Sequence, residues 1–109
     1  MIQMSSEYED IIMQIIANAG NGKTEAILAL RSAKSGDFEA ADEHITNADK
    51  AVTLAHNAQT MLLTKEAQDE KFELNLLTVH SQDHLMNAIT FLDFSKEFIG
   101  VLKEKPSLN

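Results

Sequence analysis

The chain has 109 residues, of which 17 are acidic and 9 are basic, and its formal net charge is −8 at pH 7. A surface of this sign repels phosphate backbones, which makes nucleic acids and anionic membranes poor partners. The chain contains no cysteine, so disulfides, thiolate zinc sites and thiol nucleophiles are excluded. The length indicates a single domain over 1–109. Because the sequence has no secretory signal pattern and no apolar run long enough for a membrane span, we expect a cytoplasmic protein.

The composition favours an all-α fold. Glycine occurs four times and proline once, at Pro106, whereas a β-sandwich or barrel needs turn residues about every ten positions. Hydrophobic residues make up 44% of the chain and aromatic residues only 6%. The core must therefore come from aliphatic side chains, packed through stripes on amphipathic helices.

We predict a first helix over about 5–34. Ser5, followed by acidic residues in the next turn, is typical of a helix N-terminus. Apolar residues then recur at helical spacing, at Ile12, Ile15, Ile16 and Ala19. Gly20 and Gly22 interrupt this pattern, and two glycines cost about 2 kcal/mol relative to alanine inside a helix. We expect a kink, a bulge or a true break at this point.

Two further helices follow. Gly36 after a lysine predicts the end of the first helix, and Asp37 predicts the N-cap of a second helix over about 38–67. The polar segment 68–71 is too short for a crossover, so a third helix over about 72–104 should return antiparallel to the second. Pro106 marks its end. The methionines fall at helical spacing and are interpreted as core residues.

Two assemblies fit the periodicity. Three helices of about 30 residues would each be ~45 Å long, and one antiparallel bundle of that shape would leave apolar strips of the third helix exposed. This favours self-association, in which helices from several subunits complete one core. The alternative is a compact monomeric four-helix bundle in which the chain turns at 20–22.

The most unusual segment is a polar stripe on the third helix. At about 100° per residue, His80, Asp83 and His84 share one sector, with apolar residues on both sides. Asp83 and His84 are the i+3 and i+4 neighbours of His80. A carboxylate beside a histidine can hold the ring in one tautomer, as a nucleophilic imidazole requires. The alternatives are a surface or interface pair, or two metal ligands on one helix face.

The other histidines indicate less chemistry. His44 lies in an acidic segment over 39–49 and is interpreted as a solvated surface residue. His56 is interpreted as a histidine with a partner between helices. The metalloprotease pattern is absent, because it needs a glutamate directly after the first histidine and this chain has Ser81.

The run V-H-S-Q-D-H-L-M over 79–86 resembles the V-H-A-Q-D-H-L-M signature of the lactose/cellobiose (N,N'-diacetylchitobiose) family of phosphotransferase-system enzyme IIA components. Other segments resemble the family in the same order, at Ala19-Gly20, 33–38, Ala55-His56, Gln59-Thr60 and Glu66-Ala67. The chain departs from the family at 21–24, where the family has Ala-Arg-Ser, and at Thr78, where an apolar residue is common.

The resemblance implies a fold, a reaction and a set of partners. Members of this family are cytoplasmic homotrimers of antiparallel three-helix subunits, which together form a nine-helix bundle. His80 would accept a phosphoryl group on Nε2 from the phosphocarrier protein HPr and pass it to a cysteine of the cognate IIB component. That component, with the membrane component IIC, serves the uptake and phosphorylation of a disaccharide of the lactose, cellobiose or chitobiose type. Gln82 and His84 would orient or hydrogen-bond the phosphoryl group.

The resemblance also implies that Asp83 lies on the threefold axis, where three copies share Mg²⁺ or another divalent cation. Three carboxylates meeting on an axis repel one another, by about 4 kcal/mol per pair at about 4 Å and an effective dielectric constant of about 20. A hard divalent cation with oxygen ligands, or a shared proton, would relieve this repulsion.

Two other functions are open to a helical protein with such a histidine. A histidine phosphotransfer domain of two-component signalling is a monomeric four-helix bundle, and it carries Lys and Gly where this chain has Asp83 and His84. The other is a non-enzymatic helical interaction or metal-binding module. A monomer in solution would favour either of these over the trimeric phosphoryl-transfer component.

Overall fold

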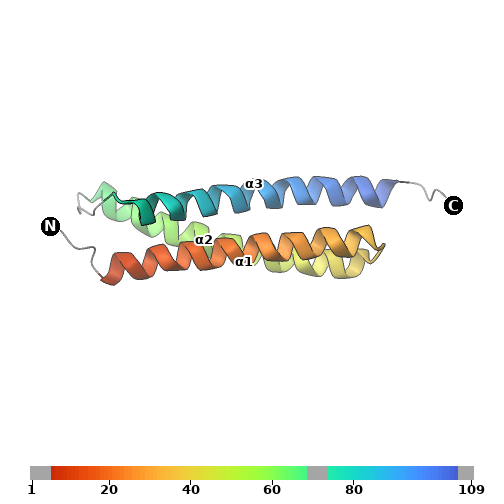
Figure 1. The fold of residues 1–109 in the computed structure, drawn as a ribbon, viewed down its shortest axis with the longest axis horizontal. Helices are drawn as coiled ribbons and strands as arrows, with labels where there is room; N and C mark the ends of the chain where they lie inside the picture. The colour runs from red at the N-terminus through yellow and green to blue at the C-terminus, as the bar shows by residue number, and fades with distance from the viewer. Residues whose placement is uncertain (1–5, 69–73, 106–109) are drawn as a thin grey trace.

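The computed structural model describes residues 6–68 and 74–105, which form three long helices: α1 (Ser6–Lys34), α2 (Phe38–Ala67) and α3 (Leu76–Glu104). The helices lie side by side along one axis, with α2 antiparallel to both α1 and α3 (Figure 1). The prediction of an all-α, antiparallel three-helix subunit is therefore confirmed. Across these residues no helix has the length and apolar run needed to cross a membrane.

Each helix buries a single stripe of residues whose spacing alternates between three and four. A repeat of this kind averages about 3.5 residues per turn and keeps one seam facing the neighbouring helices. The seam on α1 is Tyr8, Ile11, Ile12, Ile15, Ala19, Gly22, Ala26, Ala29 and Ala33. The seam on α2 is Ala41, Ala48, Ala51, Ala55, Ala58 and Leu62. The seam on α3 is Thr78, Ser81, Leu85, Ala88, Leu92, Ser95 and Ile99.

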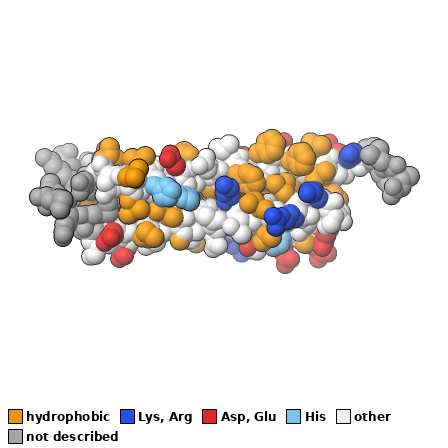
Figure 2. All heavy atoms as spheres, viewed as in Figure 1, with side chains coloured by type: hydrophobic (Ala, Val, Ile, Leu, Met, Phe, Trp, Pro, Cys, Tyr) orange, Lys and Arg blue, Asp and Glu red, His pale blue; other side chains and the backbone are white. Residues whose placement is uncertain are grey.

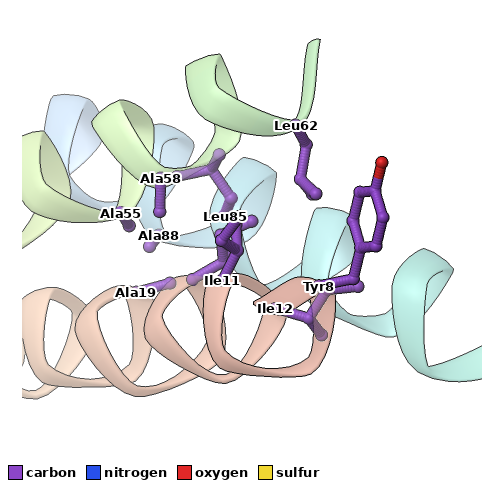
Figure 3. Close-up of a cluster of buried hydrophobic side chains, with 10 residues drawn as sticks. Tyr8, Ile11, Ile12, Ala19, Ala55, Ala58, Leu62, Leu85 and Ala88 are labelled. Carbon is purple, nitrogen blue, oxygen red and sulfur yellow. The ribbon is translucent and has the colours of Figure 1, made fainter. Parts of the chain in front are cut away.

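The side chains that α1 buries become smaller along the bundle axis. At the N-terminal end of α1, large side chains such as Tyr8, Ile11 and Ile12 pack with Leu62 of α2 and Leu85 of α3 (Figure 3). At the other end α1 contributes alanines, whose small side chains allow close approach of helices. α1 packs along both of its neighbours, whereas α2 and α3 contact each other much less. α1 is therefore the element that holds the subunit together.

The segment around Gly20 and Gly22 does not break the first helix. α1 runs without interruption from Ser6 to Lys34, so the expectation of a bulge or a true break was wrong, and with it the four-helix alternative. The expectation of a kink stays a prediction. Gly22 is instead a site of close packing, since a Cβ built on it would lie 2.6 Å from Cγ2 of Val52. The absence of a side chain lets α2 approach the α1 backbone there.

The connection from α1 to α2 follows the predicted chemistry. Gly36 adopts φ 85°, a conformation that side-chain-bearing residues rarely take. The Asp37 carboxylate accepts a hydrogen bond from the backbone N–H of Ala40 at 3.1 Å, which caps the start of α2. α2 begins and ends at the predicted residues.

The third helix begins later than its pattern predicts. Leu74 and Asn75 are not helical, and α3 starts at Leu76 with Asn75 as its N-cap. α3 therefore starts after the predicted position of about 72. The prediction extended the apolar spacing in the N-terminal direction past Asn75, which is the capping residue. Residues 69–73, which include most of the predicted polar turn, and Ser5, the predicted first cap, lie outside the described residues.

Among the described residues, three polar pairs link α2 to α3, which pack loosely against each other. Lys103 donates to Asp42 at 3.0 Å and Lys96 to Asp49 at 2.7 Å, and both pairs are exposed. Gln59 donates to Gln82 at 2.5 Å in a part-buried contact. Exposed ion pairs contribute only about 0–1 kcal/mol each, so their main effect is on the register of the two helices.

Replacing Gly22 by alanine tests the close approach of α1 and α2. We expect Gly22→Ala to lower the free energy of unfolding by about 1–2 kcal/mol, because overpacking against Val52 outweighs the gain in helix propensity. Gly20→Ala is the matched control. A Cβ at Gly20 meets nothing within 4 Å, so that variant should gain about 0.5–1 kcal/mol. Urea unfolding at one fixed protein concentration measures both, and equal stabilisation by the two variants would contradict the packing.

Candidate functional site

The site begins at the capped end of α3. The Asn75 side-chain oxygen accepts two hydrogen bonds from Thr78, from its backbone N–H and from its hydroxyl, each at 2.9 Å. These contacts satisfy one of the free N–H groups of the first turn and fix where the helix starts. His80 lies in the next turn, so its position depends directly on this cap.

Two buried hydroxyls bracket His80 in the chain. Thr78 and Ser81 are 4% and 0% exposed, so each hydroxyl needs a partner. Ser81 Oγ donates to the carbonyl oxygen of Thr78 at 2.6 Å, and Thr78 bonds to the cap. The sequence reasoning missed Asn75, Thr78 and Ser81 as parts of the site. An asparagine directly before the run Leu-Leu-Thr-Val could have indicated the N-cap.

His80 and His84 form a hydrogen-bonded pair on the outside of α3. Their Nε2 atoms are 3.0 Å apart, and the two rings meet edge to face with centroids 4.4 Å apart. His80 is exposed and His84 is half-buried. A bond between two imidazole nitrogens needs one N–H and one lone pair, so the two rings must carry opposite tautomers at Nε2.

Asp83 lies on the exposed face of α3 and does not hold the ring of His80. Within the described residues its carboxylate has no hydrogen bond or ion pair, and the polar partner of His80 is His84. The described part of one chain also contains no group of three or more His, Asp or Glu side chains that could hold a metal ion. Asp83 is therefore not part of a three-side-chain metal site within the described residues of one chain.

Gln82 lies on the other side of the helix from His80. Residues two apart on a helix do not face each other, and Gln82 instead turns to α2, where its Oε1 accepts from Gln59. The structure thus brings His80, His84 and the exposed Asp83 to the outer surface of α3 and directs Gln82 towards Gln59 on α2.

Exposed apolar side chains line the outer part of α3 on either side of the histidine pair along the helix. The outward residues of α3 include Leu76, Val79, Met86, Phe94, Phe98 and Val101, each more than two-fifths exposed. Figure 2 shows histidine side chains among hydrophobic ones over the first part of α3, and a further hydrophobic patch towards its C-terminal end. Phe94 and Phe98 stack with centroids 6.1 Å apart. A face this apolar is characteristic of a surface that binds another protein chain.

The predictions for the methionines, for His44 and for His56 were wrong. Met13, Met61 and Met86 are about half exposed, so these methionines are not core residues of the subunit. His44 is not a solvated surface residue, because it is half-buried and its Nδ1 lies 2.6 Å from Glu25 Oε2 on α1. His56 is exposed, and its side chain has no interhelical hydrogen bond in the part of the chain that the structure describes.

The helical bundle presents an imidazole pair on its surface, within the run V-H-S-Q-D-H-L-M. The chain belongs to the family described as "PTS system, Lactose/Cellobiose specific IIA subunit", whose model matches residues 10–103. It is therefore a phosphotransferase-system relay component of the lactose/cellobiose type. This membership sets aside the two-component and metal-binding alternatives.

Similar proteins cover nearly the whole chain. The lichenan-specific phosphotransferase enzyme IIA component of Bacillus subtilis (strain 168) is 48% identical over 93% of this chain and 92% of its own length. The crystal structure of the cellobiose-specific enzyme IIA from Bacillus anthracis has a TM-score of 0.88 and 43% identity, covering 94% of this chain and 93% of that one.

A third similar protein is solved with a partner. It is the IIA(Chitobiose) of a IIA(Chitobiose)-HPr complex from the Escherichia coli phosphotransferase system, with a TM-score of 0.77 and 33% identity over 89% of this chain and 94% of that one. The three names carry three different sugars, so similarity assigns the family and not the sugar.

Removing the Asn75 cap should loosen the turn that carries His80. We expect Asn75→Ala to cost about 1 kcal/mol of folding free energy and to speed hydrogen exchange at the amide of Thr78, because the side-chain oxygen that accepts from it is removed. The amide of Val79, which donates to the backbone carbonyl of Asn75, should also exchange faster as the uncapped turn frays. Asn75→Asp keeps an acceptor oxygen and is the matched control, with stability near that of the wild type. Equal exchange rates in Asn75→Ala and the wild type would show that the cap does not hold this turn.

Proposed function

We propose that this protein accepts a phosphoryl group on Nε2 of His80 from the phosphocarrier protein HPr. It then passes the group to a cysteine of a cognate IIB component, for the uptake and phosphorylation of a disaccharide. The observation that carries this proposal is the exposed His80–His84 pair, in which Nε2 of His80 takes part in a 3.0 Å hydrogen bond on the outer face of α3.

The chemistry is an exchange of one phosphorus–nitrogen bond for another. The lone pair on His80 Nε2 attacks the phosphorus of the donor's phosphohistidine, and the bond from phosphorus to the donor imidazole breaks as the new bond forms. In the second step a thiolate of IIB attacks the same phosphorus, and the His80 imidazole leaves with its lone pair restored. Catalysis of such a transfer is mainly a matter of positioning and charge stabilisation.

His84 has a role in both states of His80. Before transfer, an N–H on Nε2 of His84 can donate to Nε2 of His80, which keeps the attacking nitrogen unprotonated and the proton of His80 on Nδ1. After transfer that lone pair is in the new bond, and the same N–H of His84 can donate to a phosphoryl oxygen. A charge-assisted bond of this kind is stronger than a neutral one.

The start of α3 also favours a phosphoryl group. Side chains on a helix point towards its N-terminus, so a phosphoryl group on His80 lies towards the positive end of the α3 dipole. The first turn of α3 contains no acidic residue, whereas the first turns of α1 and α2 contain Glu7, Glu9 and Glu39. A chain that is acidic overall thus leaves the helix end beside His80 free of first-turn carboxylates.

The partner assignment is supported by the solved IIA(Chitobiose)-HPr complex, whose IIA component has the same fold. The exposed apolar residues around His80 provide a surface on which a protein partner can dock. As in other components of this relay, we place the protein in the cytoplasm, where the phosphocarrier acts.

We further propose a homotrimer in which three copies of α3 meet along a threefold axis, giving nine helices. Support comes from the second apolar face of α3, on which Leu76, Val79, Phe94 and Val101 are exposed in the subunit. Asp83 lies in the same sector of the helix as these residues. Packing three such faces together would bury them and bring the three Asp83 carboxylates close to the axis.

In this trimer the active site is shared between subunits. Because Gln82 faces away from His80 on its own helix, a contact of its carboxamide with a phosphoryl group would have to be made with the His80 of a neighbouring subunit. The supporting role that the family resemblance implies for Gln82 is therefore a role across the subunit interface.

Asp83 is the residue that would hold a divalent cation, Mg²⁺ by preference. One carboxylate from each of three subunits makes a set of hard oxygen ligands, which suits Mg²⁺. The cation would neutralise the mutual repulsion of the carboxylates and so stabilise the assembly.

The histidine assignment is tested with phosphoenolpyruvate, enzyme I and HPr. We expect the wild type to gain one acid-labile phosphate per subunit and His80→Ala to gain none, because the accepting nitrogen is gone. His56→Ala, which changes an exposed histidine on α2, is the control and should be phosphorylated normally. Equal labelling of His80→Ala and the wild type would refute the assignment.

The proposal that Asp83 binds a cation on the threefold axis is tested with Asp83→Leu. We expect the Asp83→Leu trimer to lose its divalent cation and to melt at a higher temperature, since three repelling carboxylates are replaced by packed apolar groups. Atomic spectroscopy, light scattering and thermal unfolding measure these changes. Asp93→Leu makes the same change elsewhere on α3 and should keep the cation. Unchanged metal content in Asp83→Leu would exclude Asp83 as the ligand.

A further inference from the structure

Gln59 on α2 makes a direct contact with the run over 79–86 on α3. Its Nε2 donates to Oε1 of Gln82 at 2.5 Å, and both side chains are half-buried. The other two polar links between these helices end in exposed lysine side chains, far from His80 in the chain. An amide–amide bond differs from them in having a direction, since one group must donate and the other accept.

The direction of this bond follows from the buried hydroxyl of Ser81. Its proton is committed to the carbonyl oxygen of Thr78 at 2.6 Å, so Ser81 Oγ can only accept a further bond. The group that approaches Ser81 Oγ, at 3.4 Å, is Nε2 of Gln82. Because its nitrogen faces Ser81, Gln82 presents its oxygen to α2. Gln59 must therefore be the donor in the bond between the two side chains.

The arrangement leaves one N–H of Gln82 unused. A carboxamide nitrogen carries two protons, and in the described residues Ser81 is the acceptor for only one of them. The remaining N–H belongs to a side chain that is half-buried and so is partly open to the surface. A phosphoryl oxygen is an acceptor, so an N–H at this place attracts it, whereas a carbonyl oxygen there would repel it.

We propose that Gln59 is a positioning residue for phosphoryl transfer: by donating to Oε1 of Gln82, it keeps a free N–H of Gln82 directed at the phosphoryl group of the neighbouring subunit. This role rests on the proposed function, in which Gln82 serves the His80 of a neighbour. Gln59 itself does not touch the phosphoryl group.

Gln59→Glu is the sharpest test, because it keeps the shape of the side chain and turns its donor into an acceptor. Gln82 must then rotate its amide to donate to the new carboxylate, which presents its oxygen to the phosphoryl group. We expect about 10-fold lower kcat for transfer from phospho-HPr and about 10-fold faster hydrolysis of the phosphohistidine, since one hydrogen bond to a charged group is lost. KM should stay near the wild-type value because Gln59 is not part of the docking surface.

Two controls separate positioning from charge and folding. Gln14→Glu adds the same charge at an exposed position on α1 and should leave kcat and hydrolysis unchanged. In Gln82→Leu the effect of Gln59→Glu should vanish, because Gln59 acts only through Gln82. Circular dichroism and thermal unfolding of each variant verify that it is folded.

The outcomes distinguish this inference from the function on which it rests. If the wild type is phosphorylated and Gln59→Glu has the same kcat and hydrolysis rate, the role of Gln59 is wrong and the function stands. An effect of Gln59→Glu that persists in the Gln82→Leu background would also overturn it. If the wild type gains no phosphate, the proposed function fails and this role fails with it.

Discussion

A bundle of three helices can cover only one face of each helix, and α3 is apolar on two faces. One face carries the seam of Leu85, Leu92 and Ile99 and packs on α1. The other carries Leu76, Phe94 and neighbouring apolar residues and is exposed in the subunit. Burial of apolar area contributes about 25 cal/mol per Å², so this uncovered face would supply the main driving force for the proposed trimer. The histidine pair lies at the edge of this face, so the proposed trimer would bring the proposed chemistry close to the contact between subunits.

The site is held by short-range polar contacts more than by the core. Asn75 fixes the start of α3, Thr78 and Ser81 satisfy their hydroxyls within the same turn, and Gln82 ties that turn to α2. These contacts matter because α2 and α3 pack loosely against each other. A helix held by hydrophobic contact alone could rotate slightly about its axis, whereas directional hydrogen bonds resist such rotation. The position of His80 is thus set by bonds a few residues away.

Where the sequence predicted well, the signal was local or periodic. Gly36 and Asp37 marked the α1–α2 connection because a positive φ and a side-chain cap each depend on one residue's own chemistry. The 3–4 spacing of apolar residues identified three helices because the spacing is a property of each segment alone. Where the sequence misled, the answer depended on a second helix. Gly22 reads as a helix breaker in isolation, and only the nearby Val52 shows that it is a point of close approach.

The sequence by itself determined the fold class, because helical spacing of apolar residues is visible in a single chain. It also indicated the family and the candidate nucleophile, because both depend on one contiguous run over 79–86. Only the tertiary structure decided which neighbours these residues have. It paired His80 with His84 instead of Asp83, His44 with Glu25, and Gln59 with Gln82. The last two pairs join residues 19 and 23 positions apart on different helices. Their contact depends on the rotation and register of packed helices, which no local pattern encodes.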